Sequence, residues 1–112
     1  MLLLEGNKPA EIRGYLHQLG VSTDMPDPEG STGQVFFPVG RGAPIVWVQS
    51  RQDIKTLTHE LLHVTFQLLR LRGVRESPES EETYTYTLEY LLDQAMCAKG
   101  WRKLKVSACT KY

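Results

Sequence analysis

The segment from about Arg51 to Arg72 has the strongest helical periodicity in the chain, and Gly73 follows it directly. Ser50 or Asp53 is a suitable N-terminal cap, and a glycine just after the last periodic residue is a common helix stop. At about 100° per residue, the apolar side chains of this segment fall on one stripe. They are Ile54, Leu57, Leu61, Val64, Leu68 and Leu71. The sequence therefore predicts a long amphipathic helix with one packed side.

The side of this helix opposite the apolar stripe carries the pattern His-Glu-x-x-His, as His59, Glu60 and His63. Residues four apart on a helix have Cβ atoms about 5–6 Å apart, so the two imidazoles can bind one zinc ion. Glu60 points off the metal axis, where a carboxylate can take a proton from a metal-activated water. Two histidines also meet by chance on some packing helices, but Leu62 and Phe66 beside this pair indicate a partly walled cleft. We predict a metal site.

A zinc site that keeps one position open for water needs a third protein ligand. The segment from Ser77 to about Ala98 predicts a second helix that offers carboxylates. One face of it carries Glu82, Tyr86, Glu89 and Asp93, and the opposite apolar face carries Tyr84, Leu88, Leu91 and Ala95. Glu82 is the first candidate for the third ligand, followed by Glu89 and then Glu81. His17, the remaining histidine, is expected to be an ordinary packing or surface residue.

The face that carries Glu82 offers two further roles. Asp93 or Glu89 is a candidate to orient a ligand imidazole by accepting a hydrogen bond from its second nitrogen. Tyr86 is a candidate donor of a hydrogen bond to the oxyanion of a tetrahedral intermediate. Its alternative interpretation is a tyrosine with a half-buried ring and its hydroxyl group in water. For the whole polar row, the alternative is a solvated surface.

Two short runs rich in aromatic and branched residues predict a β-hairpin in the middle of the chain. They are Gln34 to Val39 and Pro44 to Gln49, and Gly40-Arg41-Gly42-Ala43 between them is typical of a turn. Pro38 and Pro44 lack a backbone N–H donor, which places at least one of the two strands near a sheet edge.

The remaining segments complete one small domain of the α+β class. Pro9 to Leu19 predicts a short N-terminal helix, and Ser22 to Gly33 has loop chemistry, where we expect mobility. Trp101 to Tyr112 has no clear period and is expected to form a strand or a docked tail. Since 112 residues leave no room for a second hydrophobic core, we predict a single domain over residues 1–112.

Composition argues against several classes of partner. Lys plus Arg and Asp plus Glu both count 13, so the formal net charge is zero and favours neither a nucleic-acid partner nor an anionic membrane. The apolar run from Met1 to Leu4 is far shorter than a signal-peptide core or a membrane span. We therefore expect a cytoplasmic protein, with Cys97 and Cys109 as reduced thiols.

The stretch from Val35 to Met96 resembles the zincin metallopeptidases, and within them the gluzincins, whose third ligand is a glutamate on a later helix. The similarity rests on the predicted hairpin, on His59-Glu60-Leu61-Leu62-His63, and on Glu81-Glu82-Thr83-Tyr84-Thr85-Tyr86. Short phage-encoded or otherwise minimal zincins are the most similar. In such compact families the ligand glutamate tends to stand three residues before a small residue, as Glu82 stands before Thr85, and this favours Glu82 over Glu81.

The resemblance implies a zinc-dependent metallopeptidase that hydrolyses peptide bonds in a peptide or protein substrate, with Glu60 as the general base. The metal ligands that it implies are His59, His63 and Glu82. It also implies that the substrate lies against an edge strand. We assign that strand to Pro44 to Gln49, with Val46, Trp47 and Val48 along it.

Two rival interpretations follow from departures from the zincin pattern. The chain lacks the second subdomain that usually forms half of the cleft, and 112 residues offer little wall for substrate subsites. A catalytically weak or inactive zincin-like domain that serves as a binding or assembly module is therefore the first rival. The second is a latent peptidase whose cleft is covered by the basic and aromatic segment from Trp101 to Tyr112. Metzincins are disfavoured, because their longer histidine pattern is missing.

Overall fold

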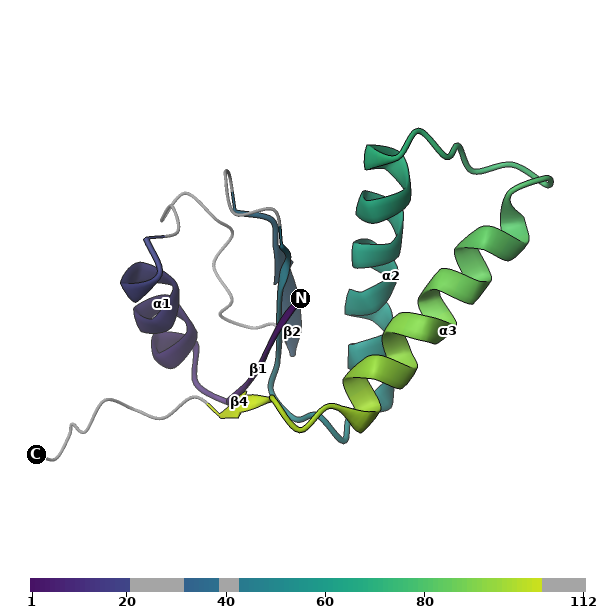
Figure 1. The fold of residues 1–112 in the computed structure, drawn as a ribbon. Coiled ribbons are helices and arrows are strands. Elements are labelled where there is room, and N and C mark those ends of the chain that lie inside the picture. Colours follow the sequence, from purple (N-terminus) through teal and green to yellow (C-terminus); the bar gives the residue numbers. More distant parts are fainter. Residues whose placement is uncertain (21–31, 39–42, 104–112) are drawn as a thin grey trace, which may run out of the picture.

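The computed structural model describes residues 1–20, 32–38 and 43–103, which form helices on both faces of a mixed β-sheet. In chain order the elements are β1 (Leu2–Glu5), α1 (Pro9–Gln18), β2 (Gly33–Phe36), β3 (Ile45–Val48), α2 (Ile54–Leu71), α3 (Glu81–Cys97) and β4 (Arg102–Lys103). Helix α1 covers one face of the sheet, and α2 and α3 lie on the other side (Figure 1). The predicted α+β class is confirmed.

The core has two parts, one on each face of the sheet. Between the sheet and α2 with α3, the buried side chains are Leu3, Val46, Val48, Leu57, Leu61, Val64, Leu91, Ala95 and Trp101. Between the sheet and α1, they are Leu4, Ile12, Leu16, Phe36, Ile45 and Trp47. Since neighbouring residues of a strand point to opposite faces, Leu3 packs under α2 and Leu4 packs under α1.

The described strands have the order β2-β3-β1-β4. The predicted hairpin is confirmed, because β2 pairs antiparallel with β3. Strand β1 was not predicted, yet it lies inside the sheet and pairs parallel with both β3 and β4. A strand covered by helices on both faces is apolar throughout and shows no alternation, so the short run of leucines carries no strand periodicity.

The prediction that Pro44 to Gln49 is the edge strand is wrong. β3 lies between β2 and β1, and its residues Val46, Trp47 and Val48 are fully buried. The physical reason is β1, which occupies the side of β3 that a substrate would have used. Among the described strands, β2 is the outer strand beside α2, so one strand of the hairpin does lie at an edge, as expected.

The two long helices agree with their predicted faces and differ at their ends. On α2 the middle of the predicted stripe is buried, whereas Ile54 and Leu71 at its ends are 42% and 73% exposed. Helix α3 begins at Glu81 and not at Ser77. Ser77 and Ser80 instead exchange hydrogen bonds between their hydroxyl groups and backbone N–H groups, which closes a turn before the helix.

Several predicted segments fall wholly or partly outside the described residues. They are positions 22–31 of the predicted loop, position 39 of the first predicted strand, positions 40–42 of the hairpin turn, and positions 104–112 of the tail. The start of that tail is described: Trp101 is buried and its Nε1 donates to the Ala95 carbonyl oxygen at 2.7 Å. Arg102 and Lys103 then form β4, so a strand is present at this point. In the described part of the chain, no helix has the length and apolar character to cross a membrane.

Candidate metal centre

The N-terminal end of α2 is held to the edge strand by a small polar network. Asp53 caps the helix and accepts hydrogen bonds from the Thr56 hydroxyl group at 2.6 Å and from its backbone N–H at 3.2 Å. These two bonds hold the pKa of the Asp53 carboxyl below its usual value. Thr56 Oγ1 also lies 3.1 Å from Thr32 Oγ1, next to β2. The helix turn that precedes Glu60 is therefore fixed relative to β2.

The imidazoles of His59 and His63 lie together on the open side of α2. Their ring centroids are 5.1 Å apart, and their planes meet at 76°. Both residues are exposed, and the His59 side chain is 70% exposed. The prediction that they project away from the apolar stripe is confirmed. Two nitrogen donors one helical turn apart, both open to solvent, can reach a single ion.

In contrast to the two exposed imidazoles, Glu60 is almost fully buried and only 7% exposed. Its Oε2 atom lies 3.9 Å from His59 Nε2. Burial raises the pKa of the Glu60 carboxyl, and this effect outweighs the opposing influence of His59 and His63. The carboxylate is thus next to the imidazole pair but held on the sheet side of the helix.

Gly33 is what allows α2 to approach the edge strand so closely. A Cβ atom at Gly33 would lie 2.7 Å from Thr56 Cγ2, 3.0 Å from the Trp47 carbonyl oxygen and 3.2 Å from Glu60 Cγ. Neither the branched Thr56 side chain nor the backbone of β3 can move away cheaply. Gly33 therefore sets the distance between β2 and Glu60.

We expect Gly33→Ala to destabilise the protein by about 1–3 kcal/mol, because the added methyl group forces β2 and α2 apart. Urea-induced unfolding measures this loss. Gly14→Ala is the matched control, since no atom lies within 4 Å of a Cβ at this position of α1, and it is expected to stabilise by up to about 1 kcal/mol. Equal stability of the two variants would contradict the close contact at Gly33.

The other predicted site residues lie elsewhere on α3. The described residues contain no group of three His, Cys, Asp or Glu side chains close enough to hold a metal ion. Exposed on α3, away from its buried face, are Glu82, Tyr86, Glu89 and Asp93. Tyr86 is 63% exposed. The structure thus brings His59, Glu60 and His63 together and does not bring Glu82 or Tyr86 to them.

The packing of α3 explains this separation. Helix α3 packs through the face that carries Tyr84, Leu91 and Ala95, and α2 and α3 diverge toward the N-terminal end of α3 (Figure 1). Glu82 lies at that diverging end. Glu81, the last of the three candidates, instead lines a groove with Leu62 and Phe66 of α2. The role of Glu82 as third ligand stays a prediction.

Two residues that position the site were missed from the sequence. Gly33 stands at the end of the predicted loop, and no local pattern marks a close contact between a strand and a distant helix. Thr56 did carry a signal, because it stands four residues before Glu60 and so lies on the same side of α2.

The remaining candidate ligands lie away from the imidazole pair. His17 is exposed on α1, across the sheet from α2 (Figure 1). Cys97 is an exposed free cysteine whose Sγ donates to Asp93 Oδ1 at 3.7 Å, and Cys109 lies outside the described residues. Comparison with known proteins finds no family model, no curated protein and no solved structure that matches this chain.

Proposed function

We propose that this protein is a zinc-dependent peptidase in which His59 and His63 bind the metal ion and Glu60 is the general base. One observation carries the proposal: two imidazoles 5.1 Å apart on the open side of α2, with a buried carboxylate 3.9 Å from one of them. Imidazole nitrogens are preferred zinc ligands, and catalytic zinc sites take three protein ligands and keep one position for water. The two imidazoles on α2 are suited to be two of these three protein ligands.

The chemistry is divided between the metal and the chain. Bound zinc would polarise the scissile carbonyl and make a water molecule more acidic. Glu60 would accept a proton from the attacking water as the water oxygen adds to the scissile carbonyl, and would return the proton to the leaving amine as the C–N bond breaks. Its burial against Gly33 restricts the Glu60 side chain, so little reorganisation is needed. Glu82 is proposed as the third ligand, because its position in the sequence resembles that of the ligand glutamate in gluzincins.

Strand β2 is the proposed site for the substrate backbone. The Gln49 N–H donates to the Thr32 carbonyl oxygen, and hydrogen-bonded pairs alternate along an antiparallel ladder. The peptide groups of Val35 therefore face away from β3. An extended peptide that pairs with this side of β2 passes next to Glu60, because Gly33 of the same strand contacts it.

Metal analysis tests the ligand set. We expect the purified protein to hold zinc at near one equivalent, Glu82→Ala to lose it, and Glu89→Ala to keep it, because of these two carboxylates only Glu82 is proposed to bind the metal ion directly. Plasma emission spectrometry after mild purification measures the content. Wild-type protein without zinc would refute the proposed function, whereas loss of zinc in Glu89→Ala alone would move the third ligand to Glu89.

A catalytically weak or inactive binding module is the second candidate. It is favoured by the exposure of the imidazoles, since the His59 side chain is 70% exposed and His63 is exposed as well. Hydrolysis gains from excluding bulk water, and this side of α2 is open. A protein that binds zinc but cleaves no peptide from a mixed library would support this candidate. Latency through the C-terminal tail stays a prediction, because residues 104–112 lie outside the described part of the chain.

A further inference from the structure

A groove with a volume of about 370 Å³ lies between α2, α3 and the turn that precedes α3. Leu62 stands three residues after His59, and Phe66 stands three residues after His63, so both line the neighbouring strip of α2. Pockets for small ligands typically span about 300–1,000 Å³. The groove is thus large enough for a substrate side chain and adjacent to the proposed site of cleavage.

The walls of the groove are mostly apolar. Leu62 and Phe66 come from α2, and Tyr84 and Leu88 come from α3. Leu62 is 38% exposed, which is high for a leucine between two packed helices. Such a surface suits a long aliphatic chain, which would remove these side chains from water.

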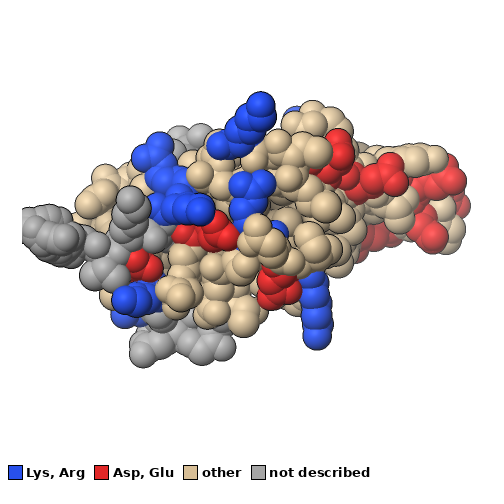
Figure 2. Space-filling model, turned by 90° about the horizontal axis from the view of Figure 1, so that it is seen from below, with Lys and Arg blue, Asp and Glu red and all other residues tan. Residues whose placement is uncertain are grey.

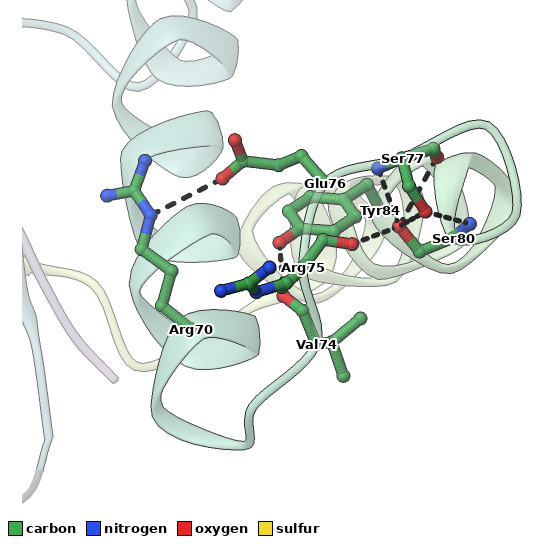
Figure 3. A network of polar contacts seen from close by, with 7 residues as sticks. All are labelled: Arg70, Val74, Arg75, Glu76, Ser77, Ser80 and Tyr84. Carbon is green, nitrogen blue, oxygen red and sulfur yellow. Dashed lines mark hydrogen bonds and ion pairs between the residues drawn. The ribbon is translucent and has the colours of Figure 1, made fainter.

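Hydrogen bonds fix the turn that closes the far end of the groove (Figure 3). The Tyr84 hydroxyl group donates to the Val74 carbonyl oxygen at 2.6 Å, and the Tyr84 ring packs against Phe66 with centroids 5.6 Å apart. Burial, and then the charge of Glu76, raises the pKa of Tyr84, so the hydroxyl group stays protonated as a donor. Ser80 bonds to Ser77 and also donates to a backbone carbonyl oxygen. The end wall is therefore formed before any ligand binds.

Negative charge gathers at this end of the groove. Glu76 and Glu81 line it, and no Lys or Arg is among its lining residues. Glu76 already pairs with Arg70, with Nε and Oε1 3.3 Å apart, whereas Glu81 has no ion pair with any described residue. Figure 2 shows Asp and Glu side chains concentrated at one end of the molecule, and most Lys and Arg side chains elsewhere. A cation in the groove would meet Glu81.

We propose that this groove is the specificity pocket of the peptidase and that it takes a lysine or arginine side chain of the substrate. The inference rests on the proposed function. The aliphatic stem packs on Leu62, Phe66 and Leu88, and the cationic head pairs with the Glu81 carboxylate. A glutamate of the substrate is rejected by the like charge, and an uncharged chain of the same length keeps the packing but loses the ion pair.

Peptide sets that place lysine, norleucine or glutamate at each position in turn test this specificity. In wild-type protein we expect kcat/KM at one position to be about fivefold higher for lysine than for norleucine, as for a partly exposed ion pair. Glu81→Gln is expected to lower kcat/KM for the lysine peptide about fivefold and so to remove this preference. Glu79→Gln is the matched control, because Glu79 is exposed in the turn before α3 and does not line the groove. It should keep the preference.

The outcomes separate this inference from the proposed function. Equal cleavage of the lysine and norleucine peptides, or an unchanged preference in Glu81→Gln, would refute the specificity pocket and leave the proposed peptidase function intact. Loss of zinc from Glu81→Gln would show that this residue is a metal ligand, which also overturns the pocket. If the wild-type protein cleaves no peptide, the proposed function is wrong. Direct binding of the same peptides then tests whether the groove binds a lysine side chain. Binding weakened about fivefold by Glu81→Gln for the lysine peptide alone would support it, and equal binding would refute it.

Discussion

Replacing Glu60 with glutamine is expected to lower peptide cleavage by about 10²–10⁴-fold and to leave the zinc content unchanged. Glutamine has nearly the shape of glutamate, so it fits the buried position against Gly33. It has no carboxylate to accept a proton from water. Turnover of a library-derived peptide, measured together with metal content, separates this loss of chemistry from a loss of metal.

Two histidine variants complete the comparison. His63→Ala is expected to lose both zinc and cleavage, because it removes one of the two imidazoles whose ring centroids lie 5.1 Å apart. His17→Ala should change neither quantity, since His17 is exposed on α1 across the sheet. Full cleavage by Glu60→Gln would exclude Glu60 as the general base, and zinc retained by His63→Ala would exclude His63 as a ligand.

Trp47→Ala is expected to destabilise the protein by about 3–5 kcal/mol, the usual range for removing a buried tryptophan. Trp47 is fully buried in β3 and packs with α1 and the α1 side of the sheet. Its Nε1 also donates to the Gly6 carbonyl oxygen at 2.9 Å. Urea-induced unfolding, followed by circular dichroism, measures the loss in the free energy of unfolding.

Trp47→Phe is the matched control for this core position. It keeps an aromatic ring in the core and removes the hydrogen bond to Gly6, so we expect a smaller loss, of about 1–3 kcal/mol. A loss below about 0.5 kcal/mol in Trp47→Ala, as at a surface position, would contradict the burial of Trp47 between the sheet and α1.

The imidazole pair and the groove lie on neighbouring strips of the same helix, and this has a consequence for catalysis and specificity. His59 and His63 are on the open strip, while Leu62 and Phe66 face α3. Glu60 faces β2 on the other side. The imidazole pair thus lies between the strip that contacts β2 and the strip that lines the groove. A single helix carries the proposed base, the proposed metal ligands and one wall of the proposed specificity pocket.

Features that depend on local periodicity could be predicted from the amino-acid sequence. The two faces of α2 could be predicted, because side chains at helical spacing share a side whatever the helix packs against. The same holds for α3, where Tyr84, Leu91 and Ala95 are buried and Glu82 is exposed. The hairpin of β2 and β3 was predicted from two short apolar runs. These features need only neighbouring residues along the chain.

How these elements meet is visible in the three-dimensional packing and not in any local pattern. Strand β1 exists through its pairing with β3 and β4, and this pairing makes β3 an interior strand and leaves β2 at the edge. The contact of Gly33 with Glu60 joins residues that are distant in the chain. The position of Glu82 relative to the imidazoles depends on the angle between α2 and α3. These arrangements follow from the packing of side chains far apart in sequence, which no local pattern records.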